Sequence, residues 1–263
     1  MRLFFLRRSW NALARRDPFW AVLTDPEKRG RQWQPEEFFA TGVETIKREL
    51  DSVRSRYPEL RMGQALDFGC GVGRLTQALA GHFERVVGVD IAEDMLALAR
   101  THNRHGDRVE YLHNHRSDLR LLASDRFDFV CSIITLQHME PALSRAYIAE
   151  FVRVCAPGGV VVFQIPAHQP EENILRLERL TSSWWPPTFF RRLWRISLQQ
   201  LPFWVQSIRL QPVMEMHGIP EAEVVALLET SGARLLGVNR HDAAGETVRS
   251  YDYLAVKKPA ARN

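Results

Sequence analysis

A glycine-rich loop and an acidic residue after the following strand are the groups in this sequence best suited to chemistry. The loop carries Gly69, Gly71 and Gly73 and follows an apolar run. Glycines let the backbone turn sharply and approach a ligand closely, and the helix after such a loop offers unpaired N–H groups at its start. Asp90 ends the next apolar run, where an acid binds the ribose hydroxyls of nucleotide-type ligands in α/β folds. The pair predicts a cofactor site, with a plain tight turn at the loop and a helix N-cap at Asp90 as the structural alternatives.

A histidine lies where a reacting group is expected. His138 follows the fourth apolar run, and a neutral imidazole there can remove a proton from a hydroxyl substrate. A histidine that only packs or bonds within its loop is the structural alternative. His217 precedes the last predicted helix and can face the same cleft. The other histidines and the three cysteines show no metal-ligand spacing, so no metal is predicted.

These candidate residues stand at the ends of short apolar runs, which are typical of strands buried in a parallel sheet. The runs are 65–68, 86–89, 109–112, 127–134 and 160–165. Helical stretches separate them near 73–82, 92–104 and 141–155. Because strands and helices alternate, the sequence predicts an α/β fold with a doubly wound sheet.

The pattern changes after Pro166. Residues 167–219 carry no clear strand, and a helix is then predicted over 220–232. Two last apolar runs, at 233–238 and 251–256, are joined by a short connection that contains a glycine. A short connection with glycine between two strands favours a hairpin.

The N-terminal part has a different composition. Residues 1–33 are basic and aromatic, and a proline and two acids at 35–37 open a helical pattern that runs to about Tyr57. We therefore expect three parts. They are an N-terminal helical cap (1–60), a cofactor-binding domain (61–166 and 215–258) and an aromatic and basic insertion (167–214).

Four segments together resemble the class I S-adenosylmethionine (SAM)-dependent methyltransferases, nearest to those that methylate small molecules and quinones. The segments are LDFGCGVG at 66–73, VDIAEDML at 89–96, FDFVCS with LQH at 127–138, and VCAPGGV at 154–160. The resemblance covers residues 60–166 closely and 220–257 loosely. It implies a Rossmann-like sheet of seven mostly parallel strands with an antiparallel C-terminal hairpin, and SAM as the cofactor.

The resemblance also implies roles at the methionine end of SAM. The loop glycines would pass close to the methionine moiety, and Asp67 would orient its ammonium group. Asp90 would hold the ribose hydroxyls. Ser132 and Ile133, after the fourth strand, would face the methyl donor.

At the adenine end, the resemblance implies that Ile91 and Met95 pack on the ring. A polar residue after the third strand usually meets the adenine amino group. Asn114 and Asp118 are the candidates here, and Asn114 is preferred because it lies nearer the end of the strand.

Residues 179–214 contain no acidic residue but hold five arginines and four tryptophans. Basic and aromatic side chains together suit a membrane interface or an anionic lipid-linked substrate. A lid that packs its aromatic residues on the core, and a nucleic-acid contact, are the alternatives. Because the cysteines are few and unclustered and no uncharged run is long enough to span a membrane, we expect a cytoplasmic protein with membrane-surface contact through this stretch.

The prediction for function is a SAM-dependent methyltransferase of a small-molecule, glycan or lipid-linked acceptor, with O-methylation favoured. A nicotinamide dehydrogenase is disfavoured because Arg74 stands where its loop needs a third glycine. A nucleic-acid methyltransferase that modifies amino groups would show Asn-Pro-Pro-Tyr where this chain has Cys-Ser-Ile-Ile at 131–134. That class, and a SAM-fold protein that only binds a partner, remain the alternatives.

Overall fold

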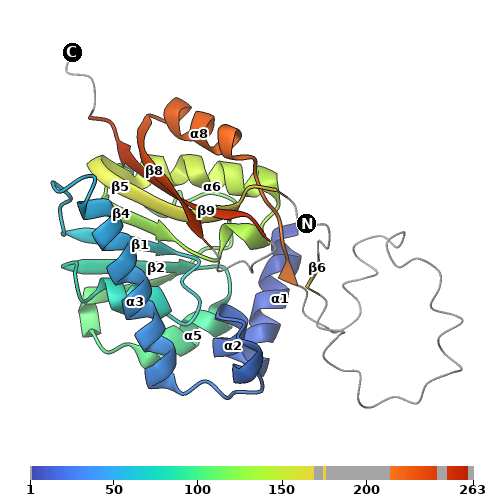
Figure 1. The fold of residues 1–263 in the computed structure, drawn as a ribbon. Coiled ribbons are helices and arrows are strands. Elements are labelled where there is room, and N and C mark those ends of the chain that lie inside the picture. The colour runs from blue at the N-terminus through green and yellow to red at the C-terminus, as the bar shows by residue number, and fades with distance from the viewer. Residues whose placement is uncertain (1, 169–173, 176–213, 242–247, 260–263) are drawn as a thin grey trace, which may run out of the picture.

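A central sheet with helices on both faces forms the core of the protein (Figure 1). The computed structural model describes residues 2–168, 174–175, 214–241 and 248–259. The strands of the sheet are β1 (Gln64–Phe68), β2 (Arg85–Asp90), β3 (Val109–His113), β4 (Phe127–Ser132), β5 (Cys155–Pro166), β8 (Ala233–His241) and β9 (Ser250–Lys257).

The strand order is β3-β2-β1-β4-β5-β9-β8. The first five strands pair in parallel, and β9 is antiparallel to both β5 and β8. The predicted fold is therefore confirmed: a Rossmann-like, mostly parallel seven-stranded sheet that ends in an antiparallel pair. In such a sheet the chain reverses its winding direction beside β1, and ligands bind beyond the carboxyl ends of the strands at that point.

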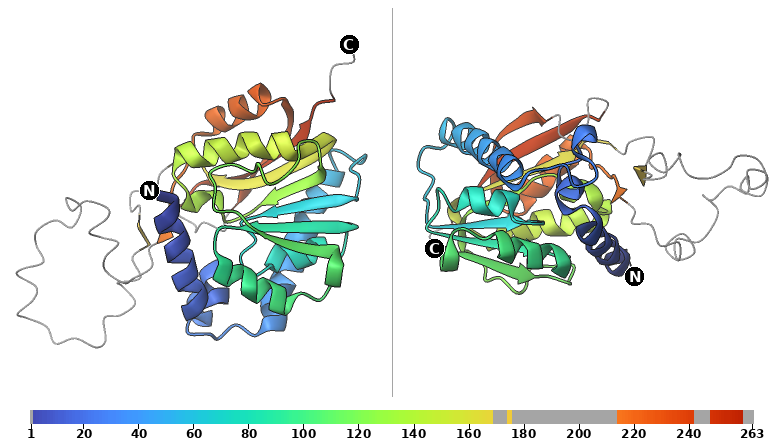
Figure 2. Two further views of the ribbon diagram at one scale, coloured as in Figure 1. Left: turned by 180° about the vertical axis from the view of Figure 1, so that it is seen from behind. Right: turned by 90° about the horizontal axis from the view of Figure 1, so that it is seen from below.

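Helices cover both faces of the sheet. They are α3 (Pro35–Arg54), α4 (Arg74–Leu79), α5 (Glu93–His102), α6 (Pro141–Val154) and α8 (Glu221–Thr230). One apolar cluster joins α3, α4 and α5 to the first face. A second joins α6 and α8, which lie side by side, to the other face (Figure 2). The alternation of buried strand and amphipathic helix thus produces two cores, one on each side of the sheet.

The N-terminal segment contains α1 (Arg2–Arg16), α2 (Pro18–Val22) and the 3₁₀ turn η1 (Pro26–Lys28). Helix α1 is fixed to the start of α5, where the Asp94 N–H donates to Asn11 Oδ1 at 3.0 Å and Arg15 pairs with the Asp94 carboxylate at 2.9 Å. Asp17 then accepts hydrogen bonds from the backbone N–H groups of Gly30 and Arg31. These contacts hold the first helix against the cofactor-binding half of the sheet.

Two details differ from the sequence prediction. Strand β4 ends at Ser132 rather than at Ile134, which has a φ of 57°. The stretch predicted to lack strands contains a short antiparallel pair, β6 (Ile174–Leu175) with β7 (Met214–Glu215). Two-residue strands carry too little periodicity for a sequence pattern to reveal them.

Several predictions fall outside the described residues. The hairpin connection lies within 242–247, and nearly all of the basic and aromatic stretch at 179–214 lies within 176–213. The division into a cap (1–60), a cofactor-binding domain (61–166 and 215–258) and an insertion (167–214) stays a prediction. Within the described residues, no helix has the length and apolar character needed to cross a membrane.

Candidate functional site

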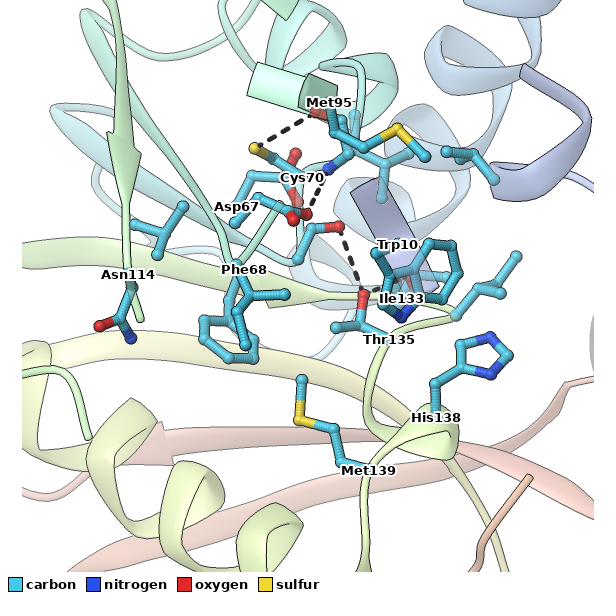
Figure 3. Close-up of a pocket in the computed structure, with 18 of the residues that line it drawn as sticks. Trp10, Asp67, Phe68, Cys70, Met95, Asn114, Ile133, Thr135, His138 and Met139 are labelled. Atoms are coloured by element: carbon cyan, nitrogen blue, oxygen red, sulfur yellow. Dashed lines mark hydrogen bonds between the residues drawn. The ribbon is translucent and has the colours of Figure 1, made fainter. Parts of the chain in front are cut away.

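A pocket lies at the carboxyl ends of β1, β2 and β4, where the topology places ligand sites (Figure 3). Most of the candidate site residues meet there. Those that line it are Asp67, Gly69, Gly71, Asp90, Ile91, Met95, Asn114, Ile133 and His138. Gly73 and Ser132 are not among the described residues that line it.

The glycine loop has a backbone that only glycine adopts readily. Gly69, Gly71 and Gly73 all have a positive φ, at 75°, 52° and 85°. A side chain at Gly69 would collide with Thr135 after β4, so this glycine lets the two loops touch. Gly73 begins α4 and faces the ring of Tyr111 instead of the pocket. Its role is to place the helix, whereas Gly69 and Gly71 form the pocket wall.

The Asp90 side chain binds the glycine loop. One carboxylate oxygen accepts from the Gly71 N–H and the other from the Ala92 N–H, both at 2.8 Å. Burial raises the pKa of Asp90, and these N–H donors oppose that rise. The residue at the N-cap of α5 is Ala92, so Asp90 closes a turn instead of capping the helix. Each carboxylate oxygen keeps a second lone pair, which can accept a ligand hydroxyl.

Asp67 lies deeper in the same wall and is buried. Its carboxylate accepts from the Thr76 hydroxyl at 2.6 Å. Burial raises its pKa to about 6, while the Thr76 hydrogen bond and the nearby Arg74 charge act in the opposite direction. At neutral pH the carboxylate is therefore charged and can attract a ligand cation.

Asn114 lines the far side of the pocket, but its amide also shapes its own loop. Nδ2 donates to the Asp118 carbonyl at 2.9 Å, and Oδ1 accepts from the Arg116 N–H at 3.1 Å. The Asp118 carboxylate pairs with Arg120 at 3.1 Å and is not part of the described pocket wall. Of the two candidates for the adenine amino group, only Asn114 lines the pocket.

His138 is buried and neutral. Its Nδ1 lies 2.9 Å from the Glu215 carbonyl, and because a carbonyl only accepts, Nδ1 carries the proton. The basic lone pair is therefore on Nε2, which lies 3.3 Å from Gln137 Nε2. Burial lowers the pKa of His138 to about 4. His217 pairs with Glu215 at 3.0 Å and does not line the described pocket, contrary to expectation.

Helix α1 supplies a wall that the sequence did not predict. Leu3, Leu6 and Trp10 line the pocket, and the Trp10 ring meets the His138 ring edge-on at 5.2 Å between centroids. Figure 3 shows Trp10 and His138 on the same side of the pocket, away from Asn114. The enclosed space is about 70 Å³, room for a few water molecules. A larger ligand therefore requires part of the pocket wall to move, and the α1 side chains belong to that wall.

Other lining residues were also missed. They are Val22, Phe68, Cys70, Arg74, Leu75, Val89, Ile134, Thr135, Met139 and Tyr147. Thr135 and Met139 lie close to His138 in the chain, so the motif around the fourth strand could have indicated them. The α1 residues had no such signal, because no short-range pattern tells which distant loop a helix covers.

Comparison with known families finds a match over the central part of the chain. Residues 65–159 match a family described as a methyltransferase domain. The chain is 35% identical over 121 residues to a ubiquinone biosynthesis O-methyltransferase of Aromatoleum aromaticum, covering 44% of this chain and 50% of that protein. It is 32% identical over 149 residues to the enzyme of that name from Hahella chejuensis, covering 56% and 61%. The chain thus spans about half to three fifths of the length of these relatives.

Solved structures share the fold. Magnesium protoporphyrin IX methyltransferase from Synechocystis, solved with bound SAH, has a TM-score of 0.60 at 16% identity and covers 97% of this chain and 99% of that one. A SAM-dependent methyltransferase from Clostridium acetobutylicum has a TM-score of 0.58 at 15% identity, with coverages of 84% and 92%. At these identities the likeness concerns the arrangement of strands and helices.

Proposed function

We propose that this chain, whose residues 65–159 form a methyltransferase domain, transfers a methyl group from SAM to a hydroxyl oxygen of a small molecule. One observation carries the proposal. At the carboxyl edge of the sheet, the Asp90 carboxylate accepts a hydrogen bond from the Gly71 N–H. The apolar side chains of Ile91 and Met95 line the pocket beside it. This arrangement offers hydrogen bonds to a ribose next to a surface on which an adenine ring can pack.

The residues present fit SAM as the cofactor. The buried Asp67 carboxylate suits the ammonium of the methionine moiety, and the glycine loop leaves its backbone accessible. Asp90 suits the ribose hydroxyls, and Asn114, which lines the pocket, is proposed to meet the adenine amino group. When bound, SAM supplies an electrophilic methyl group on its sulfonium. The protein's part is then to bind, to orient and to exclude water.

An oxygen acceptor is proposed on two grounds. The relatives at 30–36% identity are named ubiquinone biosynthesis O-methyltransferases. In addition, the neutral His138 keeps the lone pair of Nε2 for a proton. Gln137 holds its amide NH₂ toward that nitrogen because its own carbonyl accepts from Gln164 at 3.1 Å. An acceptor hydroxyl must displace this weak contact to deliver its proton to His138.

We also propose contact with an anionic membrane surface, on the basis of the amino-acid composition of residues 179–214. The stretch 179–214, with its arginines and tryptophans, lies almost wholly outside the described residues. An acceptor embedded in or linked to lipid would make such contact useful, because enzyme and acceptor would meet at the same surface.

Labelled SAM tests the activity. The full chain is incubated with labelled SAM and, in separate reactions, with dihydroxybenzenes, with quinols in vesicles, and with RNA or DNA. We expect label only in the hydroxyl acceptors, as O-methyl products by mass spectrometry, and much less of it with the Asp90→Ala variant at limiting SAM. Label in nucleic acid would favour the competing enzyme class. SAM binding without transfer to any acceptor would favour a non-catalytic binding protein.

A further inference from the structure

A second cavity, of about 680 Å³, lies beside the cofactor pocket. It is open to solvent on one side and is lined by Leu23, α3, the start of α4, the residues after β4 and the β8–β9 pair. The two cavities share three wall residues, Arg74, Ile133 and Ile134. A ligand in this second cavity would therefore lie directly behind the residues expected to face the methyl donor.

Buried charged groups line this cavity. Glu49 of α3, Arg74 of α4 and Asp252 of β9 are exposed by only 2%, 4% and 3%. Burying a charge is costly unless a partner or a ligand compensates for it. Arg48 pairs with Glu49 at 3.1 Å, which satisfies one member of the group.

Arg74 is only partly satisfied. Its Nη1 donates to the hydroxyls of Thr41 and Thr45, both at 3.3 Å. Its Nε–H is buried and has no hydrogen-bond partner among the described residues. A buried N–H without a partner costs about 1–3 kcal/mol, so a polar ligand group at this position would be stabilising. Gly42 allows α3 to lie close to the start of α4, because a side chain at this position would collide with the Arg74 carbonyl.

The wall between the two cavities is strained. Ile134 has a φ of 57°, a conformation that a β-branched residue rarely adopts. Its N–H donates to the buried Gln164 carbonyl oxygen at 3.0 Å, which helps to keep the backbone in this form. Backbone strain of this kind persists mainly at sites that bind or react, where the surrounding structure enforces it.

We propose that this second cavity binds a small carboxylic acid, whose carboxylate meets the Arg74 guanidinium. The planar guanidinium of arginine matches a carboxylate in shape and charge. Leu23 and Ile133 provide an apolar wall for the rest of the molecule. Binding of the acid does not depend on the proposed methyl transfer.

The charge of the cavity changes with pH. The pKa of Asp252 is raised to about 8, mainly by burial and then by the nearby Glu49 charge, while Arg48 opposes the rise. Burial also raises the pKa of Glu49. Besides these α3 groups, the groups around Asp252 are Arg74 of α4, Arg240 of β8, Glu44 of α3 and Cys131 of β4. At neutral pH Asp252 is therefore mostly uncharged, and as the pH rises through about 8 it becomes an anion that repels a carboxylate.

Calorimetry with benzoate and with benzamide, its uncharged counterpart, tests the site in the full chain without SAM. We expect benzoate to bind at least about tenfold more tightly than benzamide at neutral pH. Arg74→Lys should remove most of this preference, since lysine keeps the charge but loses the planar N–H fork. Arg54→Lys, at the end of α3 and outside the cavity wall, is the control and should change nothing.

A second variant covers the case in which Arg74→Lys does not fold. Benzoate affinity should fall between about pH 7 and pH 9 in the unaltered chain, and Asp252→Asn should abolish this fall. Equal binding of benzoate and benzamide, no binding of either, or a weaker benzoate affinity in Asp252→Asn at pH 7 would overturn the proposal.

The cofactor also carries a carboxylate, so the affinity for SAM is measured in the Arg74→Lys variant. A large loss of SAM affinity without benzoate binding would assign Arg74 to the cofactor and overturn the carboxylate site.

Discussion

At the scale of single residues, Asp90 connects the glycine loop to the start of α5 through two backbone hydrogen bonds. The same carboxylate is proposed to bind the cofactor. A substitution there therefore acts on the ligand and on the loop at once, and the two effects must be separated by experiment.

The first prediction concerns Asp90→Ala. Loss of charged hydrogen bonds to the ribose should weaken SAM binding by roughly 1.5–3 kcal/mol, as measured by calorimetry. Asp107→Ala, in an exposed turn before β3, is the matched control and should bind SAM normally. Circular dichroism checks that both variants fold. An unchanged affinity in a folded Asp90→Ala protein would remove this residue from the site.

The second prediction concerns His138. If its Nε2 takes the acceptor proton, His138→Ala should lower kcat by about 10²–10⁴ and leave SAM affinity nearly unchanged. A histidine with the ordinary pKa of about 6.5 would give a decline in rate below that pH. Because burial lowers the pKa to about 4, the neutral base persists to lower pH, and the decline should begin near pH 4.

The pH–rate profiles of the two proteins decide the matter. An alanine variant with nearly full activity and an unchanged profile would make His138 a structural residue, held between Glu215 and Trp10.

The sequence identified those candidate residues whose side chains carry a charge or can take up a proton. Asp67, Asp90 and His138 were found because acids and a histidine stood at the ends of apolar runs. Gly73 and Ser132 carry the family's motif, but Gly73 packs against Tyr111 and the Ser132 hydroxyl donates to the Phe68 carbonyl at 3.1 Å. A motif includes residues that build the loop as well as those that line the pocket.

At the scale of elements, the strands were predicted well because each is a buried apolar run. The ends of the strands were predicted less accurately. Ile133 and Ile134 continue the apolar pattern of β4, although the strand ends at Ser132. Only the long-range contact of the Ile134 N–H with Gln164 explains that turn. The second cavity could not be predicted at all, because its walls come from elements far apart in the chain.

The third prediction concerns the contact between α3 and α4. Alanine favours a helix over glycine by about 1 kcal/mol, so Gly42→Ala would stabilise an isolated α3. In the folded protein the added methyl would collide with the Arg74 backbone, and we expect a net loss of about 1–3 kcal/mol. Urea unfolding measures it, with the exposed neighbour Val43→Ala as the control. A more stable Gly42→Ala protein would show that the two helices can separate freely.

At the scale of the whole molecule, the described residues supply the cofactor pocket, while the stretch proposed for membrane contact lies almost wholly outside them. The fourth prediction is that the full chain sediments with anionic vesicles, and less so at high salt. Replacing Arg191, Arg192 and Arg195 with glutamine should reduce sedimentation. Neutral vesicles serve as the control. No vesicle binding at low salt would favour a simple lid, whereas equal binding to both kinds of vesicle would mean that apolar contacts and not charge drive it.

Helix α1 lines the cofactor pocket with Leu3, Leu6 and Trp10, and Asn11 and Arg15, further along the helix, fasten it to α5. This arrangement should affect the rates at which the cofactor enters and leaves the pocket. A cofactor that enters only when these side chains withdraw also leaves only when they do, so the spent cofactor should have a long residence time and release can limit turnover. Trp10→Ala should speed the dissociation of S-adenosylhomocysteine in stopped-flow measurements, while the same change at the exposed Phe4 should not. Equal dissociation rates in the two variants would mean that the helix is no barrier to exchange.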